Sequence, residues 1–221
     1  MTASAAPTDT QKLAAHARQP LVLLCLLTLV SLATLWAPPA GRESWFLEVT
    51  PGLLMVAWLA IAYKRMPLSH WVYAGVFVHV LILIYGGCYT YAKTPLGNWA
   101  KEAFHLSRNH YDRIGHIALG VFPVFLCREV LLRKTPLVRG GWLAFLSVSV
   151  VFAFAAFWEL LEWWTTLVVA SDTGTAFLGS QGDVWDAQWD MFLALLGASF
   201  ALLFFSKAHD RYMARVPYPA A

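Results

Sequence analysis

The sequence is divided into long runs of apolar residues with short polar segments between them, and this pattern restricts the chain to a bundle of membrane-spanning helices. A helix crosses the hydrocarbon core of a bilayer with about 20 apolar residues. Of the 221 residues, 59% are hydrophobic and 13% are charged, whereas an ordinary soluble domain has a charged share of about 25%. This composition excludes a soluble globular domain. Six spans are predicted, at residues 21–37, 51–63, 68–91, 114–132, 142–169 and 185–206.

The length and spacing of these runs predict a single all-α domain. Six spans with short connections use nearly the whole chain, so no second globular domain is expected. The second run is short and contains Pro51, and it reaches across the bilayer only if Trp45, Phe46 and Leu47 extend it. We expect a cytoplasmic tail at residues 1–19, a six-helix transmembrane domain at residues 20–206 and a second cytoplasmic tail at residues 207–221.

The distribution of basic residues predicts the orientation of the bundle. The two tails, the turn at Lys64 and Arg65 and the connection at residues 128–139 hold 11 of the 16 Lys and Arg residues. Because basic residues gather on the cytoplasmic side of a membrane protein, both termini are predicted to be cytoplasmic. The net charge is only +3, and no basic helix or aromatic-basic motif indicates nucleic-acid binding. The lipid bilayer is therefore the expected partner.

Seven acidic or histidine side chains lie inside or against the apolar runs, where charge is costly. A charged residue at the bilayer centre costs about 2.5–3.5 kcal/mol, so such residues are usually paired, solvated or functional. With a helical rise of about 1.5 Å per residue, all seven fall at the extracytoplasmic end of the last three spans. The seven residues are Asp112, His116, Glu159, Glu162, Asp183, Asp186 and Asp190.

The spacing of these residues places them on one face of each span. Steps of three and four residues separate the members on each helix, which gives each helix a single polar stripe. On the last span the stripe continues as Ala194, Gly197 and Ala201, and Ala155 precedes Glu159 by one turn. Small residues allow helix backbones to approach closely. The three polar stripes are therefore predicted to meet in one layer.

A layer of carboxylates beside a histidine predicts a bound cation or bound protons. Neighbouring carboxylates repel one another, and either a divalent metal or protonation relieves the repulsion. Mixed oxygen and imidazole ligands suit Zn²⁺, Mn²⁺ or Fe²⁺, whereas an all-carboxylate subset suits Mg²⁺. A relay of protonated carboxyls and a purely structural polar network are the alternatives. The predicted metal ligands are Asp112, His116, Glu162, Asp183, Asp186 and Asp190.

A metal site open to one side of the membrane suggests hydrolysis of a membrane-embedded or envelope substrate. In this hypothesis Glu159 is the general base and Arg113 holds an anionic group of the substrate. Gln181 and Gln188 either orient ligands or cap the loop. The alternatives are a proton- or cation-coupled transporter and a non-catalytic scaffold or sensor. Apart from His79, the inner half of the bundle is expected to hold almost no ionisable groups, which argues against a transporter.

Three motifs in the second half of the chain resemble a known family. They are YDRIGH at residues 111–116, FWELLEWW at residues 157–164 and FLGSQGDVWDAQWDM at residues 177–191. The chain resembles the YjdF-like family of bacterial inner-membrane proteins, a domain family of unknown function, and the resemblance implies a multi-pass protein of the inner membrane. The last three spans also have a looser similarity to VanZ-like membrane proteins, which implies an activity on a lipid-linked or glycopeptide-type molecule.

Overall fold

The computed structural model describes residues 8–168 and 177–217, and this part of the chain consists of helices joined by short loops, without strands. Six of its helical segments are long and apolar enough to cross a membrane, with α5 and α6 forming one segment. The prediction of an all-α bundle of six spans is confirmed. The elements are α1 (Asp9–Trp36), α2 (Arg42–Ala62), α3 (His70–Tyr89), η1 (Tyr91–Lys93), α4 (Pro95–Ala103), α5 (Tyr111–Val121), α6 (Pro123–Lys134), α7 (Gly141–Val168) and α9 (Asp186–Met213).

The first and last helices extend beyond their predicted spans. α1 begins at Asp9 because Thr8 and Gln11 form a capping box, in which the Gln11 amide donates to Thr8 Oγ1 over 3.3 Å and the Thr8 amide donates to Gln11 Oε1 over 2.8 Å. The helix therefore includes part of the expected tail at residues 1–19, and α9 continues to Met213 through part of the expected tail at residues 207–221. The rest of the two expected tails, at residues 1–7 and 218–221, lies outside the described residues. The predicted end of the fifth span, at residue 169, also lies outside them.

The second and fourth spans each contain a proline, and both differ from their predicted bounds. Pro51 lies inside α2, which begins at Arg42, so the second span is long enough to cross the bilayer. Pro123 divides the fourth predicted span into α5 and α6, because proline has no amide hydrogen to continue the helical hydrogen bonding. α6 then extends through Arg128 and Arg133, which had been predicted to lie in a cytoplasmic loop.

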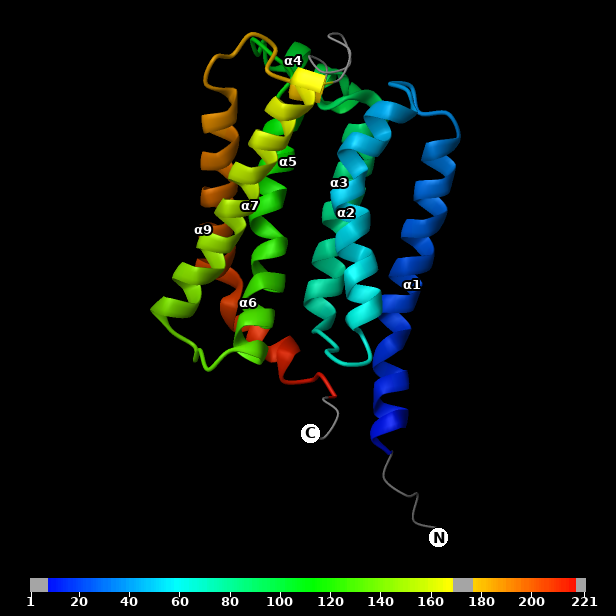
Figure 1. Cartoon of the computed structure of the whole chain (residues 1–221), viewed down its shortest axis with the longest axis vertical. Coiled ribbons are helices and arrows are strands. Elements are labelled where there is room, and N and C mark those ends of the chain that lie inside the picture. Colours follow the sequence, from blue (N-terminus) through cyan, green and yellow to red (C-terminus); the bar gives the residue numbers. More distant parts are fainter. Residues whose placement is uncertain (1–7, 169–176, 218–221) are drawn as a thin grey trace.

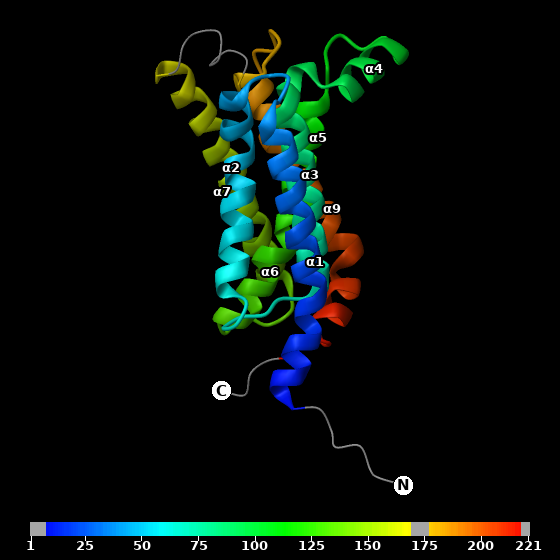
Figure 2. The same cartoon turned by 90° about the vertical axis from the view of Figure 1, so that its right-hand side faces the viewer.

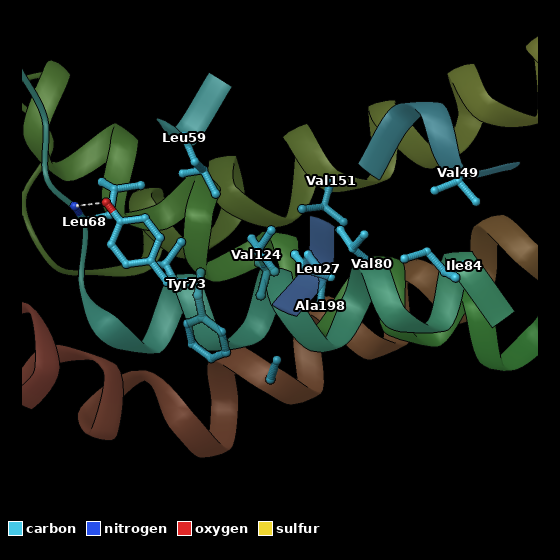
Figure 3. Packing of buried hydrophobic residues seen from close by; sticks show 14 of the residues in the cluster. Leu27, Val49, Leu59, Leu68, Tyr73, Val80, Ile84, Val124, Val151 and Ala198 are labelled. Carbon is cyan, nitrogen blue, oxygen red and sulfur yellow. Dashed lines mark hydrogen bonds between the residues drawn. The ribbon is translucent and has the colours of Figure 1, made fainter. Parts of the chain in front are cut away.

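The helices form two groups that share one apolar core. α2 packs along α3 and α1 also contacts α3, whereas α9 packs along α5 and α7. Figure 1 shows these groups side by side, and Figure 2 shows α4 at the end of the bundle away from the termini. Between the groups, Val80, Val124, Val151 and Ala198 from four different helices are buried against one another (Figure 3). We call the end that carries the start of α1 and the end of α9 the inner end, and the opposite end the outer end.

The inner end contains a buried polar network, so the expectation that this half is almost free of ionisable groups is wrong. The Glu129 carboxylate is fully buried and accepts hydrogen bonds from the Ser69 amide over 2.8 Å and the Ser69 hydroxyl over 2.6 Å. His209 Nε2 lies 3.1 Å from Glu129 Oε2, and Arg128 pairs with Asp210 over 2.9 Å. The network joins α3, α6 and α9, which the sequence does not show because the partners are far apart in the chain.

The orientation of the bundle is testable with reporter fusions. Green fluorescent protein fused after Arg65, after Arg139 or at the C-terminus is expected to fluoresce, because the positive-inside rule places these sites in the cytoplasm. Alkaline phosphatase fused after Lys101, which lies on exposed α4, is expected to be active because the same rule predicts that the outer end faces the periplasm. The reverse pattern at Arg139 and Lys101 would place the outer end in the cytoplasm.

Candidate functional site

The close approach of α5 and α9 brings their polar residues together at the outer end. A Cβ atom added to Gly120 would meet the Ala194 carbonyl and would lie 2.7 Å from the Ala198 amide nitrogen. A Cβ atom added to Gly197 would lie 3.4 Å from Gly120 Cα. Ala194 and Ala201 are fully buried along the same face. The predicted stripe of small residues is thus confirmed as a contact between helix backbones.

Above this contact, three side chains from α5 and α9 form a compact buried cluster. One potential ligand atom from each of Asp112, His116 and Asp190 lies within 4.8 Å of the others. All three residues are buried, with exposed fractions of 7%, 4% and 1%. Asp112 and His116 lie one turn apart on α5, and His116 Nε2 is 3.7 Å from Asp112 Oδ1. We call these three residues the outer triad.

Glu159 of α7 lies beside the outer triad. Its Oε1 atom is 3.4 Å from His116 Nε2, and its side chain is 8% exposed. Several polar atoms of this group are buried without a hydrogen-bond partner in the described part of the chain, namely Glu159 Oε1, Asp190 Oδ1 and His116 Nδ1. Because buried polar groups are normally hydrogen-bonded, these atoms are available to bind a ligand, an ion or water.

Asp183 and Asp186 lie next to the outer triad but are held by arginines. The Arg108 guanidinium, which is buried, pairs with Asp186, lies 3.6 Å from Asp183 Oδ2 and donates to the Gly179 carbonyl over 3.1 Å. Arg113 pairs with Asp183 over 2.7 Å. The carboxylates of Asp183 and Asp186 therefore neutralise arginines, which distinguishes them from the outer triad.

Arg113 lies at the rim of the site. Its guanidinium carbon lies 5.5 Å from the centre of the Trp189 ring, in addition to the ion pair with Asp183. The side chain is 22% exposed. An anionic group could reach Arg113 from the outer surface, but it would compete with Asp183 for the guanidinium.

A loop from residues 177–185 covers the site and is fixed by specific hydrogen bonds. Gln181 binds the backbone of Asn109 in both directions, accepting from its amide over 3.0 Å and donating to its carbonyl over 2.8 Å. Gly179 has φ +65°, and a Cβ atom there would lie 3.4 Å from Asp112 Oδ2. Of the two roles considered for Gln181, the structure supports anchoring of the loop. Burial and the neighbouring Arg113 and Arg108 lower the pKa of His110 at the edge of this loop.

Glu162 lies on the other side of the outer triad, where a large cavity begins. The cavity has a volume of about 820 Å³ and is bounded by α2, α3, α5, α6 and α7. Asp112, His116, Glu162, Glu48 and Tyr91 line its outer end. The pKa of Tyr91 is raised well above its ordinary value because the side chain is buried, so its hydroxyl stays protonated.

Three of these residues were not predicted from the sequence. Glu48 is 4% exposed and lies on α2, but the predicted second span began at residue 51 and therefore excluded it. The extension through residues 45–47 that this span needs would include Glu48, and an acidic residue in an apolar helix marks a position as unusual. Arg108 lies outside the predicted spans, and nothing in the sequence links it to Asp186. Tyr91 was one of many aromatic residues and carried no separate signal.

Comparison with known proteins supports the membrane assignment. A family model described as "Predicted membrane protein (DUF2238)" matches residues 19–211. Inner membrane protein YjdF of Escherichia coli is 41% identical over 174 residues, which cover 79% of this chain and 83% of that protein. No solved structure matches the chain. With the six apolar helices, these matches establish a multi-pass protein of the inner membrane.

Proposed function

The chain belongs to the DUF2238 family of predicted membrane proteins, and we propose that it binds a divalent metal at the outer triad and uses the metal to hydrolyse a membrane-embedded substrate. The observation that carries this proposal is the geometry of Asp112, His116 and Asp190, whose potential ligand atoms lie within 4.8 Å of one another. A cation at this position would relieve the repulsion between two buried carboxylates and bind the unpartnered Asp190 Oδ1.

The ligand types favour particular metals and leave positions for chemistry. Two carboxylates and one imidazole suit Zn²⁺, Mn²⁺ or Fe²⁺ better than Mg²⁺, which prefers oxygen ligands alone. Three protein ligands leave at least one coordination position for water, and a metal there lowers the pKa of that water. Glu159 lies close enough to accept a proton at Oε1, the atom that has no hydrogen-bond partner in the described residues.

The remaining acidic residues have separate roles in this proposal. Asp183 and Asp186 hold Arg108 and Arg113 and thereby fix the covering loop beside the outer triad. Glu162 faces the cavity and serves either as a fourth ligand after a change of side-chain rotamer or as a contact to the substrate.

Metal binding is tested by measuring the metal content of protein purified in detergent without chelators. We expect about one equivalent in the wild type. Removal of a residue that hydrogen-bonds a metal ligand typically lowers metal affinity about 10–100-fold. Removal of a ligand itself, in the Asp190→Asn or His116→Gln variant, is therefore expected to lower the affinity by more than about 100-fold. The matched control is Asp183→Asn, which removes a nearby carboxylate that pairs with Arg113 and should leave the metal content unchanged.

Two results would contradict the metal proposal. One is wild-type protein that contains no stoichiometric metal and takes up none on addition of Zn²⁺, Mn²⁺ or Fe²⁺. The other is an equal loss of metal in Asp183→Asn and Asp190→Asn, which would indicate general electrostatic attraction of cations to an acidic surface. Hydrolysis is tested separately by incubating the metal-loaded protein with vesicles of inner-membrane lipids and measuring which lipids disappear. Asp190→Asn and Glu159→Gln should leave those lipids intact.

The transporter alternative gains support from the network at the inner end. Glu129 and His209 are fully buried there, and His79 is 3% exposed between the two ends with no hydrogen-bond partner for Nδ1 among the described residues. These groups weaken the argument that no ionisable side chains lie along the inner half. Cation or proton flux into proteoliposomes that requires both Glu159 and Glu129 would favour transport, whereas lipid hydrolysis without flux favours the enzyme.

A further inference from the structure

The cavity beside the outer triad is long, and it is apolar along most of its length. Its lining extends from residue 46 to residue 58 of α2 and from residue 151 to residue 165 of α7. At a rise of about 1.5 Å per residue, these segments are about 18 Å and about 21 Å long. Asp112 and His116 lie at the outer end, and Leu126 and Cys127 of α6 lie at the inner end. The cavity therefore runs from the outer triad deep into the membrane-spanning part of the bundle.

The cavity opens sideways between α2 and α7, because residues of both helices line it and several of them are exposed. Several of its lining residues are substantially exposed, including Leu54 (66%) and Trp58 (43%) on α2 and Phe154 (62%) and Phe157 (48%) on α7. Both helices are membrane spans, so this opening faces hydrocarbon. An apolar molecule can enter from the bilayer without crossing water.

The outer end of the cavity is acidic and has unpartnered polar atoms. Glu48, Asp112 and Glu162 contribute carboxyl groups, and no Lys or Arg is among the described residues that line the cavity. Glu48 and Glu162 form no ion pair within residues 8–168 and 177–217, although both are at least 95% buried. His116 Nδ1 at this end and His79 Nδ1 deeper in the cavity are buried without a hydrogen-bond partner among these residues. A cationic or hydrogen-bonding head group suits this end.

We propose that the cavity binds one phospholipid whose head group carries a primary ammonium. The acyl chain lies along α2 and α7, and the ammonium group contacts Glu48 and Glu162. The lipid phosphate then lies next to the outer triad, where a metal would bind one of its oxygens. This placement rests on the proposed function for the identity of the substrate, but lipid binding itself can be measured without metal or catalysis. A volume of about 820 Å³ is within the usual range of about 300–1,000 Å³ for ligand pockets.

The test measures lipid that remains bound to the purified protein. The full chain is reconstituted in vesicles of equal parts phosphatidylethanolamine and phosphatidylglycerol, extracted in mild detergent and examined by native mass spectrometry. We expect one phosphatidylethanolamine per chain in the wild type. Leu126→Trp fills the inner end of the cavity and is expected to reduce this lipid at least tenfold. Glu162→Gln should keep a bound lipid but lose the preference for phosphatidylethanolamine.

Controls separate this proposal from ordinary boundary lipid and from the metal site. Leu203→Trp makes the same substitution on the exposed face of α9, where the leucine is 78% exposed, and should retain the lipid. Asp190→Asn should lose metal but keep the lipid, because Asp190 does not line the cavity. Equal lipid retention in Leu126→Trp and Leu203→Trp, or a preference for phosphatidylglycerol, would overturn the proposal. Wild-type protein that retains the lipid but holds no metal would overturn only the metal site.

The natural cysteines provide a second measurement that requires no substitution near the cavity. Cys127 lines its inner end, whereas Cys25 is exposed on α1. Addition of phosphatidylethanolamine to delipidated protein is expected to slow the reaction of Cys127 with an apolar maleimide at least fivefold and to leave the reaction of Cys25 unchanged. If the reaction of Cys127 is unaffected at saturating lipid, the cavity does not hold the acyl chain, whatever the outcome for Leu126→Trp.

Discussion

Replacement of Glu129 by alanine is expected to lower the free energy of unfolding by about 3–5 kcal/mol, because removal of one partner leaves the other buried charges uncompensated. The Glu129 carboxylate receives hydrogen bonds from Ser69, His209 and Arg133. Its side chain is fully buried, so water cannot replace the lost contacts. The measurement is unfolding in mixed micelles of detergent and denaturant, followed by circular dichroism.

The control for this prediction is another glutamate that lies on a helix surface. Glu102 is exposed on α4, and Glu102→Ala is expected to change the stability by less than about 0.5 kcal/mol. Glu129→Gln keeps the shape of the side chain and part of its hydrogen bonding, so its stability should lie between those of the wild type and Glu129→Ala. If Glu129→Ala and Glu102→Ala have the same free energy of unfolding, the inner network does not hold α3, α6 and α9 together.

Substitution of Gly120 by leucine is expected to destabilise the bundle by about 3 kcal/mol or more and to abolish the outer triad as a unit. Any side chain at this position meets the backbone of α9 at Ala194 and Ala198, and a backbone cannot yield by changing rotamer. α5 and α9 would have to move apart, which separates Asp112 and His116 from Asp190. Metal content and unfolding in mixed micelles should therefore change together.

A glycine in open space provides the matched control for Gly120→Leu. Gly141 begins α7 and has nothing within 4 Å of a Cβ atom, so Gly141→Leu should retain both stability and metal. Normal stability and metal binding in Gly120→Leu would mean that α5 and α9 do not pack as closely as described. Loss of metal with unchanged stability would instead show that the triad tolerates less displacement than the fold.

The candidate site illustrates which features the sequence could predict. The pair Asp112 and His116 and the spacing of Asp186 and Asp190 were visible because helical periodicity is a local property. The contact of α5 with α9 followed from Gly197 and its neighbouring alanines, since small residues allow close packing. Within the predicted ligand set, however, Asp186 and Asp190 look alike in sequence. Their different surroundings arise from Arg108, which lies 78 residues from its partner Asp186.

Helix ends and the inner network were harder to predict for a related reason. Hydropathy identifies the membrane-spanning part of a helix, but a helix continues into polar residues wherever backbone hydrogen bonds and a cap support it, as at Thr8. The same uncertainty at the start of α2 left Glu48 outside its predicted span. Besides Arg133, Glu129 has partners 60 and 80 residues away, at Ser69 and His209. No local pattern connects such residues.

The sequence by itself determined that the chain is a bundle of six membrane spans and that one end of its last three spans is polar, because hydrophobicity and helical periodicity act over neighbouring residues. The tertiary structure decided which polar side chains meet. It separated the outer triad of Asp112, His116 and Asp190 from the carboxylates that neutralise arginines, and it formed a cavity between α2 and α7. These outcomes depend on how distant helices pack, and each pairing is set by the shape and charge of both partners at once.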